Sequence, residues 1–230
     1  MSALKIIIGN KNYSTWSLRG WLAAMHTGLA VEEVKIDLYT PGSKTELFKH
    51  SPSGLVPALI HGDIVVWDSL AIIDYCARLA PDKFWWPEGD AAYAFARSMT
   101  AEMHSGFSSL RTHAPMNIRG KWSGLTLGDS VAADVARIDA LWSEARERFG
   151  KKDGPNGGDF LFGGFSAADM MFAPVVHRFE TYSIEASPTA RAYMDAVLAQ
   201  PLMQQWTNEG LAETAIIAQG EVPKDATRLG

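Results

Sequence analysis

The stretch Leu55–Tyr75, which reads LVPALIHGDIVVWDSLAIIDY, decides how the rest of the chain is interpreted. Its two apolar runs and the His-Gly-Asp turn between them predict a strand, a turn, a second strand and a helix. Pro57 lies inside a run that otherwise looks like a buried strand, where a proline removes one backbone donor from the ladder. We therefore expect a cis Val56–Pro57 bond, which leaves the N–H and C=O of Val56 free to pair with an extended peptide.

The helix that ends this stretch offers a place for a negative charge. Ser69 follows Asp68 and precedes an apolar helical pattern, so we predict that Ser69 caps the helix. Helix N-termini present unpaired N–H groups and a partial positive charge, which favour a carboxylate. A peptide-pairing edge beside such a helix start indicates a site for a small anionic peptide. The alternative is a hairpin whose proline lies on an exposed edge and whose serine only caps a helix.

Val56-Pro57 and the segment Asp68–Ile73 resemble the glutathione site of the cytosolic glutathione transferases. The resemblance implies that the Val56-Pro57 edge pairs with the cysteinyl backbone of glutathione. It also implies that Asp68 and Ser69 hold the γ-glutamyl end, with Ser69 on the carboxylate. Lys44 lies in the loop ahead of this edge, where the family often keeps a polar or basic residue for the glycine carboxylate. A solvated loop lysine is the alternative for Lys44.

The rest of the N-terminal half predicts an α/β unit. Leu4–Ile8 is a strand-length apolar run, Trp16–Met25 places apolar residues on one helical face, and Val31–Leu38 alternates like a strand. Thr40–His50 reads as a loop with a short helical segment. Followed by Leu55–Tyr75, these elements give a βαβ half and then a ββα half, the order of the thioredoxin-like domain of the resembling family.

The C-terminal half predicts a helical bundle. Two prolines and a glycine in residues 81–90 indicate a link, so we place the domain boundary near residue 85 and divide the chain into 1–84 and 85–230. Beyond it the helical stretches are Ala91–His113, Ser130–Phe149 and one or two helices in Ala190–Glu213. Ser166 followed three residues later by Asp169 is a capping box. This Phe-Ser-x-x-Asp start resembles the folding motif of the helical domain of glutathione transferases.

Ser14 is the predicted catalytic residue. It lies at the turn between the first strand and the first helix, where a hydroxyl and the helix field together stabilise a thiolate. The thiolate is the reactive form of a thiol. The segment Ser14–Arg19 resembles the Ser-Ser-Cys-x-x-Arg start of the zeta class and aligns Ser14 with its catalytic serine. Arg19 is placed to brace the loop or to raise the local positive potential.

Two features leave this assignment open. Thr15 and Trp16 replace the second serine and the cysteine of the zeta motif, which argues against zeta-type isomerase activity. Tyr13 and Ser17 are rival hydroxyls for the thiol, and Ser14 itself would also serve as a plain helix cap. The sequence alone therefore leaves Ser14, Tyr13 and Ser17 as alternatives.

Composition limits the partners. The chain has 230 residues and a net charge of −5 with no basic cluster, which argues against nucleic acid. No apolar run approaches the roughly 20 residues of a membrane span. The N-terminus lacks an export signal, so we expect a cytoplasmic protein. The single cysteine, Cys76, excludes an internal disulfide and reads as a packing residue. Glu102 and His104 point to different helix faces, so we expect no metal.

Three functions remain at this stage. The first is a glutathione transferase that activates the thiolate of glutathione, its co-substrate, for attack on a small hydrophobic electrophile. The second is a glutathione-dependent cis-trans isomerase, and the third is a non-catalytic, transferase-like binding module. The resemblance also implies a homodimer. The residues that line the second-substrate pocket cannot be placed from the sequence, although the segment His104–Phe107 and Arg111 are candidates.

Overall fold

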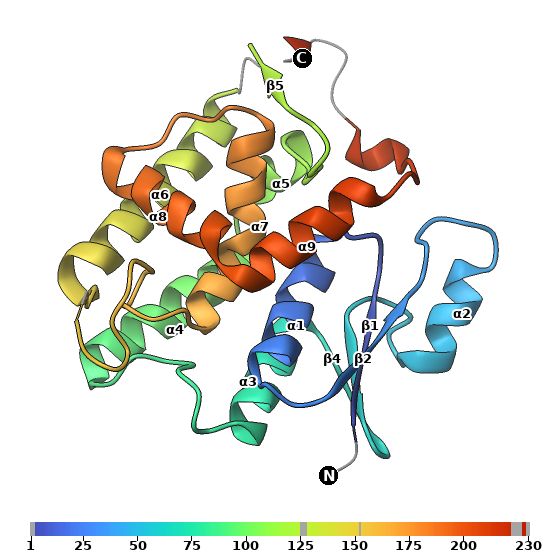
Figure 1. Ribbon diagram of the computed structural model, residues 1–230. Helices are drawn as coiled ribbons and strands as arrows, with labels where there is room; N and C mark the ends of the chain where they lie inside the picture. Colours follow the sequence, from blue (N-terminus) through green and yellow to red (C-terminus); the bar gives the residue numbers. More distant parts are fainter. Residues whose placement is uncertain (1–2, 125–127, 152, 222–226, 229–230) are drawn as a thin grey trace.

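A four-stranded sheet forms the centre of the N-terminal half (Figure 1). The computed structural model describes residues 3–124, 128–151, 153–221 and 227–228. The strands lie in the order β2–β1–β3–β4, and β2 is parallel to β1 whereas β3 and β4 run antiparallel to their neighbours. Their bounds are Leu4–Ile8 for β1, Val31–Lys35 for β2, Ala58–His61 for β3 and Ile64–Trp67 for β4. The predicted thioredoxin-like order is confirmed.

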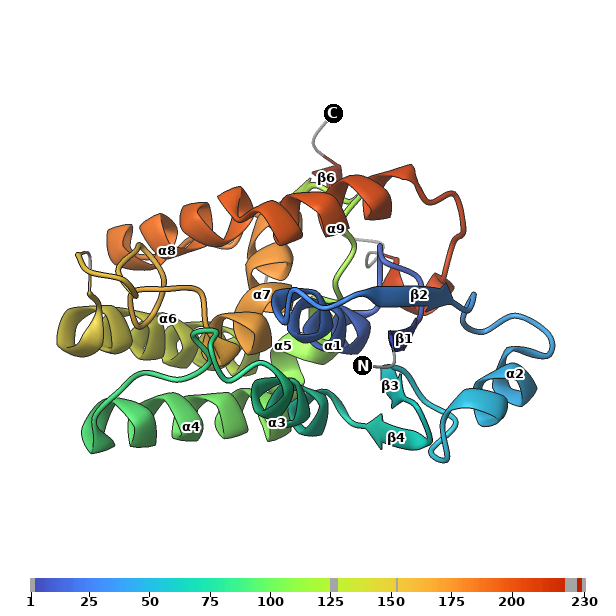
Figure 2. The same ribbon diagram turned by 60° about the horizontal axis from the view of Figure 1, so that its bottom comes forward.

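Helices cover both faces of this sheet. Successive side chains of a strand alternate between faces. Ile6 and Ile8 belong to the large apolar cluster that contains α1 (Thr15–His26) and α3 (Ser69–Leu79). Ile7 instead packs with Leu47 of α2 (Ser43–His50), Ile36 and Ala58 in a separate small cluster. Figure 2 accordingly shows α2 apart from the other helices.

The C-terminal half is the predicted helical bundle. Helices α4 and α6 lie side by side, and α8 and α9 follow one another across α7 (Figures 1 and 2). A short 3-10 turn, Ala218–Gly220, and a pair of two-residue strands, β5 and β6, were not predicted. The bounds are Asp90–Ser105 for α4, Ser108–His113 for α5, Trp122–Ser123 for β5, Asp129–Phe149 for α6, Ala167–Thr181 for α7, Pro188–Ala199 for α8, Pro201–Ala212 for α9 and Thr227–Arg228 for β6.

Two sequence predictions differ from the structure. The stretch 91–113 is not one helix, because Gly106 takes an extended backbone and Phe107 has a positive φ of 58°, so that α4 ends and α5 begins anew. Ser69 is not the cap of α3. Asp68 is the cap, with φ 75°, and its carboxylate accepts hydrogen bonds from the N–H groups of Leu70 and Ala71. An aspartate caps as well as a serine, and Ser69 becomes the first helical residue.

Helix α1 connects the two halves. It packs against β1 and α3 on one side and against α7 and α9 on the other. Leu18, Trp21 and Leu22 are fully buried in the large apolar cluster. Because the helix is enclosed by both halves, the position of its first turn is fixed by the packing of the whole chain.

Helix α7 is held at its start by the predicted capping box. The hydroxyl and the N–H of Ser166 both donate to the carboxylate of Asp169, at 2.6 and 2.8 Å, and the N–H of Leu161 donates at 3.2 Å. Burial raises the pKa of Asp169 to about 6, and the three donors act in the opposite direction. At neutral pH the carboxylate is therefore still ionised and accepts all three hydrogen bonds.

Asp169→Ala is expected to lower the free energy of unfolding by about 2–4 kcal/mol, because it removes the cap and leaves buried donors unpaired. Asp129→Ala is the matched control, since Asp129 also lies in the first turn of a helix but is exposed, and its side chain makes no hydrogen bond to another described residue. Urea unfolding measures both variants. Equal losses in the two would show that the buried cap adds nothing.

Candidate functional site

A cleft of about 710 Å³ lies between the two halves of the chain. One wall is the first turn of α1 with the loop before it, a second is the segment around α2 and the residues before β3, and the third comes from the C-terminal half. The third wall matters because three parts far apart in the sequence meet there. The residues that line the cleft are Tyr13, Ser14, Thr15, Trp16, Leu38, Tyr39, Thr40, Ser43, Lys44, Leu47, Gly54, Leu55, Val56, Pro115, Met116, Arg178, Ile217, Gln219 and Gly220.

Ser14 lies on the cleft wall at the start of α1. It is the N-cap of the helix, and its Oγ accepts the N–H of Ser17 at 3.3 Å. Its own hydroxyl donates to the Oγ of Ser17 at 2.7 Å. The residue is 8% exposed and forms part of the cleft lining. Ser14 therefore caps α1, the role that the sequence analysis gave as the alternative to a catalytic one.

The two rival hydroxyls are placed differently. Ser17 is fully buried and does not line the cleft. Tyr13 does line it, but its hydroxyl accepts from Arg119 at 2.8 Å and bonds the carboxylate of Glu221. Burial, and then the hydrogen bond to Glu221, raise the pKa of Tyr13. Its hydroxyl is therefore engaged with the C-terminal segment.

That segment closes the third wall of the cleft. Arg119 donates to the carbonyl oxygens of Glu213 and Ala215, at 2.7 and 2.8 Å, as well as to the hydroxyl of Tyr13. Ring atoms of Tyr13 lie so close to Gly220 that a Cβ there would meet one at 2.3 Å. Residues 213–220 are thus tied to the loop before α1 by Arg119, by Tyr13 and by the carboxylate of Glu213, which accepts the N–H groups of Lys11 and Asn12.

The Val56–Pro57 bond is cis, as the sequence predicts. Val56 lines the cleft, and neither its N–H nor its C=O is hydrogen-bonded to another residue that the structure describes. Pro57 packs against α1 at Gly20, where a Cβ would lie 2.7 Å from the proline ring. Lys44 also lines the cleft, and its Nζ donates to the carbonyl oxygen of Gly54 at 2.8 Å. The edge predicted to receive a peptide is therefore open.

Asp68 and Ser69 do not line the cleft itself. The Oγ of Ser69 is buried and has no hydrogen-bond partner among the described residues. The second carboxylate oxygen of Asp68 contacts the Nε2 of His104 at 2.8 Å. The ring of His104 in turn meets the ring of Trp16 edge-on, with centroids 5.5 Å apart. Asp68 is thus linked to the cleft through His104 and Trp16, because Trp16 lines the cleft. The hydroxyl of Ser69 makes no hydrogen bond to another described residue.

Three guanidinium groups lie beside the cleft, and sequence reasoning singled out Arg19 and Arg111 but missed Arg178. Arg19 and Arg111 each lie over the ring of Trp16, at 4.7 and 4.9 Å from its centroid. Arg178 lines the cleft and donates to the carbonyl oxygens of Arg111 and Ala114. None of the three forms an ion pair with a carboxylate in the described part of the chain. Burial, and then the charge of Arg111, lower the pKa of both Arg19 and Arg178, the latter to about 9.

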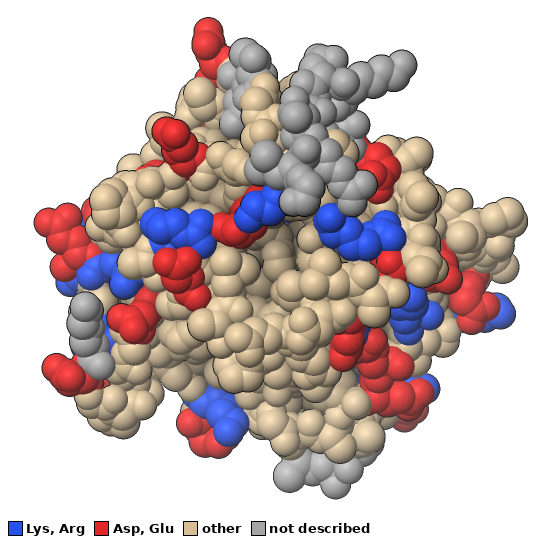
Figure 3. All heavy atoms as spheres, turned by 45° about the horizontal axis from the view of Figure 1, so that its top comes forward, with Lys and Arg blue, Asp and Glu red and all other residues tan. Residues whose placement is uncertain are grey.

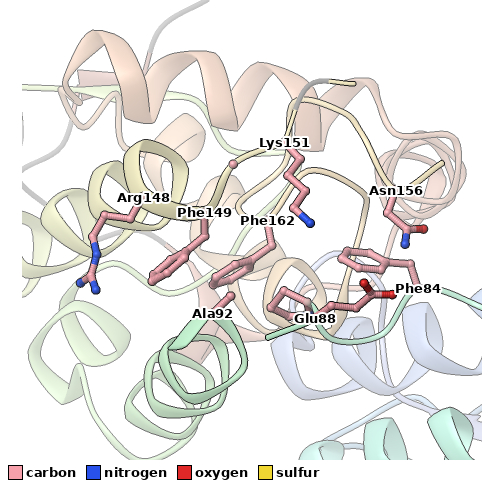
Figure 4. Close-up of a pocket in the computed structure, with 10 residues that line it drawn as sticks. Phe84, Glu88, Ala92, Arg148, Phe149, Lys151, Asn156 and Phe162 are labelled. Carbon is pink, nitrogen blue, oxygen red and sulfur yellow. The ribbon is translucent and has the colours of Figure 1, made fainter. Parts of the chain in front are cut away.

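A second, smaller hollow of about 230 Å³ lies on the C-terminal half (Figure 4). Phe84, Phe149 and Phe162 form its apolar part, and the amine of Lys151 lies above them. It has no residue in common with the lining of the large cleft, and it has no serine, cysteine or histidine. The large cleft is therefore the candidate active site.

Other site types find no counterpart in the described residues. No three His, Cys, Asp or Glu side chains are gathered there to hold a metal ion. No helix in the described ranges has the length and apolar character needed to cross a membrane. On the face shown in Figure 3, basic side chains lie next to acidic ones, and no continuous basic surface is seen.

Two family descriptions match the chain. Residues 13–79 match the glutathione S-transferase N-terminal domain, and residues 128–196 match the glutathione S-transferase C-terminal domain. The chain belongs to the glutathione S-transferase family. The first match begins at the loop that carries Ser14 and includes the Val56–Pro57 edge and the Asp68–Ser69 pair.

Relatives in this family differ in how much of the chain they match. Glutathione S-transferase 1 from Dianthus caryophyllus is 43% identical over 70 residues, which is 30% of either chain. A probable maleylacetoacetate isomerase from Caenorhabditis elegans is 22% identical over 184 residues, covering 76% of this chain and 81% of that protein. The match to the plant relative thus spans less than a third of that protein's length.

Solved structures show the same glutathione S-transferase fold. A glutathione transferase homologue from Burkholderia, with bound glutathione, is 20% identical with a TM-score of 0.66, over 91% of this chain and 98% of that one. Maleyl pyruvate isomerase, described as a bacterial glutathione S-transferase in the zeta class, is 18% identical with a TM-score of 0.67, over 92% of this chain and 100% of that one. At such identities the likeness concerns the fold alone.

Some site residues of this glutathione S-transferase left a sequence signal that was not used. Arg178 follows the apolar run from Met170 to Val176 in α7, and a charged residue on a helix that is otherwise so apolar usually has a structural or functional role. Tyr39, Gln219 and Gly220 left no such signal, because only the tertiary fold brings them to the cleft.

Arg119→Ala is expected to loosen residues 213–221, since three hydrogen bonds are lost at once. The hydrogen bonds of Glu213 to Lys11 and Asn12 remain, so we expect a partial release. Hydrogen exchange followed by mass spectrometry of this segment measures the release. Lys121→Ala is the control, because Lys121 lies two residues away and only makes a 3.6 Å ion pair with Glu180. Unchanged protection of 213–221 in Arg119→Ala would contradict the assignment.

Proposed function

We propose that this glutathione S-transferase binds glutathione in the large cleft and that the hydroxyl of Ser14 stabilises the glutathione thiolate for attack on a small apolar electrophile. The observation that carries the proposal is the place of Ser14, on the cleft wall at the N-terminus of α1. At this position a hydrogen bond to sulfur and the field of the helix both stabilise the thiolate. The proton of the thiol leaves to solvent and Ser14 keeps its own.

The free polar groups around the cleft support glutathione as the co-substrate. The unpaired N–H and C=O of Val56 suit the backbone of the cysteinyl residue. The hydroxyl of Ser69 is buried and outside the lining of the cleft, but it is unused among the described residues, and we assign it to the γ-glutamyl carboxylate at the capped start of α3. Lys44 uses one of its three donor hydrogens on Gly54 and has two left for the glycine carboxylate.

Trp16, Pro115, Met116 and Ile217 support an apolar second substrate. They belong to the parts of the cleft lining that come from α1 and the C-terminal half, whereas Val56 belongs to the segment before β3. A thiolate held at Ser14 would therefore face a largely apolar wall, and a small electrophile that buries its surface there would be oriented toward sulfur.

Ser14→Ala is expected to raise the pKa of the bound glutathione thiol by about one to two units, the worth of a hydrogen bond to a charged group. Tyr13→Phe is expected to leave that pKa unchanged, because the Tyr13 hydroxyl is engaged by Arg119 and Glu221. Ultraviolet absorbance of the thiolate, followed against pH, measures both variants. A thiol pKa that is unchanged in Ser14→Ala and raised in Tyr13→Phe would reverse the assignment.

A second function, isomerisation of a small unsaturated acid, is favoured by one observation. Arg178 lines the cleft without a carboxylate partner in the described residues, and an anionic substrate would neutralise it. In this reaction the thiolate adds to a carbon–carbon double bond, the new single bond rotates, and the thiolate leaves again. Glutathione is consumed by conjugation but is regenerated by isomerisation, so the two functions differ in an observable quantity.

Arg178→Met is expected to weaken an isomerisation of cis dicarboxylic acids by about tenfold or more, the worth of one charge-assisted hydrogen bond. Conjugation of a neutral chloronitrobenzene is expected to change less than about threefold, because no charge in that substrate needs Arg178. Parallel assays of glutathione consumption and of acid isomerisation distinguish the two. Loss of both activities to the same extent would mean that Arg178 only supports the fold.

No acidification of the thiol in the unmodified protein would favour the non-catalytic module instead.

We also propose a cytoplasmic homodimer. A free thiol co-substrate persists in a reducing compartment, which supports the cytoplasm. Strand β4 lies at one end of the sheet and exposes Ile64 and Trp67, each at 49%. Such an apolar edge strand is typically covered. We propose that a second copy of the chain covers this edge.

Trp67→Lys is expected to convert the dimer to a monomer at micromolar concentration, because the lysine charge would be buried in the dimer interface. Sedimentation velocity measures the state. Leu211→Lys is the control, since Leu211 is equally exposed, at 51%, but lies on α9. A monomeric unmodified protein would contradict the dimer.

A further inference from the structure

Two serine hydroxyls are joined at the start of α1, and only one of them reaches the cleft. The Oγ of Ser17 lies 2.7 Å from the Oγ of Ser14. It also accepts the N–H of Gly9, which follows β1, at 2.9 Å. Ser17 is fully buried, so its Oγ is fixed by the end of a strand on one side and by the first turn of the helix on the other.

The hydrogens of this pair are not all used in the ligand-free structure. A serine hydroxyl donates one hydrogen and accepts up to two. The Ser14 hydrogen goes to Ser17, and the Ser17 Oγ already accepts from Gly9 as well. The Ser17 hydrogen has no acceptor among the described residues. If Ser14 is to donate its only hydrogen to a thiolate, its present bond to Ser17 must be given up.

We propose that Ser17 is a positioning residue for Ser14 and that the hydrogen bond between them reverses when the thiolate binds. The hydroxyl of Ser14 then donates its hydrogen to the sulfur, and the hydroxyl of Ser17 donates its hydrogen to the Oγ of Ser14. Each hydroxyl keeps its own hydrogen, so no proton is transferred between the two serines. The pair then uses both hydrogens, whereas the ligand-free pair uses one.

The reversal makes Ser14 a better donor. In the reversed state its Oγ accepts from the hydroxyl and from the N–H of Ser17 while it donates to sulfur. Hydrogen bonds in such a chain polarise one another, so a hydroxyl that accepts more strongly also donates more strongly. The anchoring of Ser17 by Gly9 keeps the Ser14 oxygen at one place on the cleft wall.

The inference rests on the proposed role of Ser14, and the experiment separates the two. The pKa of the bound glutathione thiol is measured by thiolate absorbance in the unmodified protein, Ser14→Ala and Ser17→Ala. We expect Ser17→Ala to raise this pKa by about half a unit or more, which is less than the shift in Ser14→Ala. Affinity for S-methylglutathione, which has no thiol to ionise, is expected to stay unchanged in Ser17→Ala.

Thr27→Ala is the matched control. Thr27 is buried near the other end of α1, donates to the carbonyl oxygen of Ala24 at 2.6 Å and accepts the N–H of Leu29 at 3.1 Å. Its loss removes a buried hydroxyl of the same kind without touching the cleft, so stability falls but the thiol pKa is expected to stay. If Ser17→Ala does not fold, Ser17→Cys replaces it, since a thiol has nearly the same shape and is only a weak donor.

The outcomes are distinct. A thiol pKa raised by half a unit or more in Ser17→Ala or Ser17→Cys, with normal binding of S-methylglutathione, supports the inference. A smaller rise, while Ser14→Ala raises the pKa by more than one unit, overturns the role of Ser17 and leaves the proposed function intact. No rise in Ser14→Ala overturns the proposed function itself.

Discussion

The burial of helix α1 is the constraint on which the rest of the structure depends. The helix is enclosed by the sheet and α3 on one side and by α7 and α9 on the other, with Leu18, Trp21 and Leu22 completely covered. A helix held in this way cannot shift or turn without disturbing both halves of the chain. Its first turn is therefore a rigid platform, and Ser14 stands at its edge, facing a cleft.

The charged residues near this platform are arranged so that the segment 213–220 becomes part of the cleft. The amine of Lys11 lies between the rings of Trp21 and Trp206, about 5 Å from each, and is neutralised by Glu33 and Glu209. This contact fastens α9 to the sheet, and the segment that follows α9 then reaches the loop before α1. The wall of the cleft that this segment forms is thus built by contacts between residues about 200 positions apart.

The sequence predicts the parts of this arrangement that depend on local patterns. The cis Val56–Pro57 bond, the cap at Ser14 and the capping box of Ser166 and Asp169 follow from residues within a few positions of one another. Asp68 took the capping place predicted for Ser69 because two good caps stand side by side, and a pattern does not rank them. The remaining site features depend on the tertiary fold. Tyr13, Glu221 and Arg119 meet across the whole chain, and the buried hydrogen bond from Gly9 to Ser17 forms only once the strand and the helix have packed.

A crystal structure of the protein with glutathione bound tests the central claim most directly. The account predicts that the sulfur lies within hydrogen-bond distance of the Ser14 Oγ at the tip of α1, with the cysteinyl backbone paired to Val56. A sulfur that lies beside the Tyr13 hydroxyl, or out of reach of any hydroxyl, would contradict it.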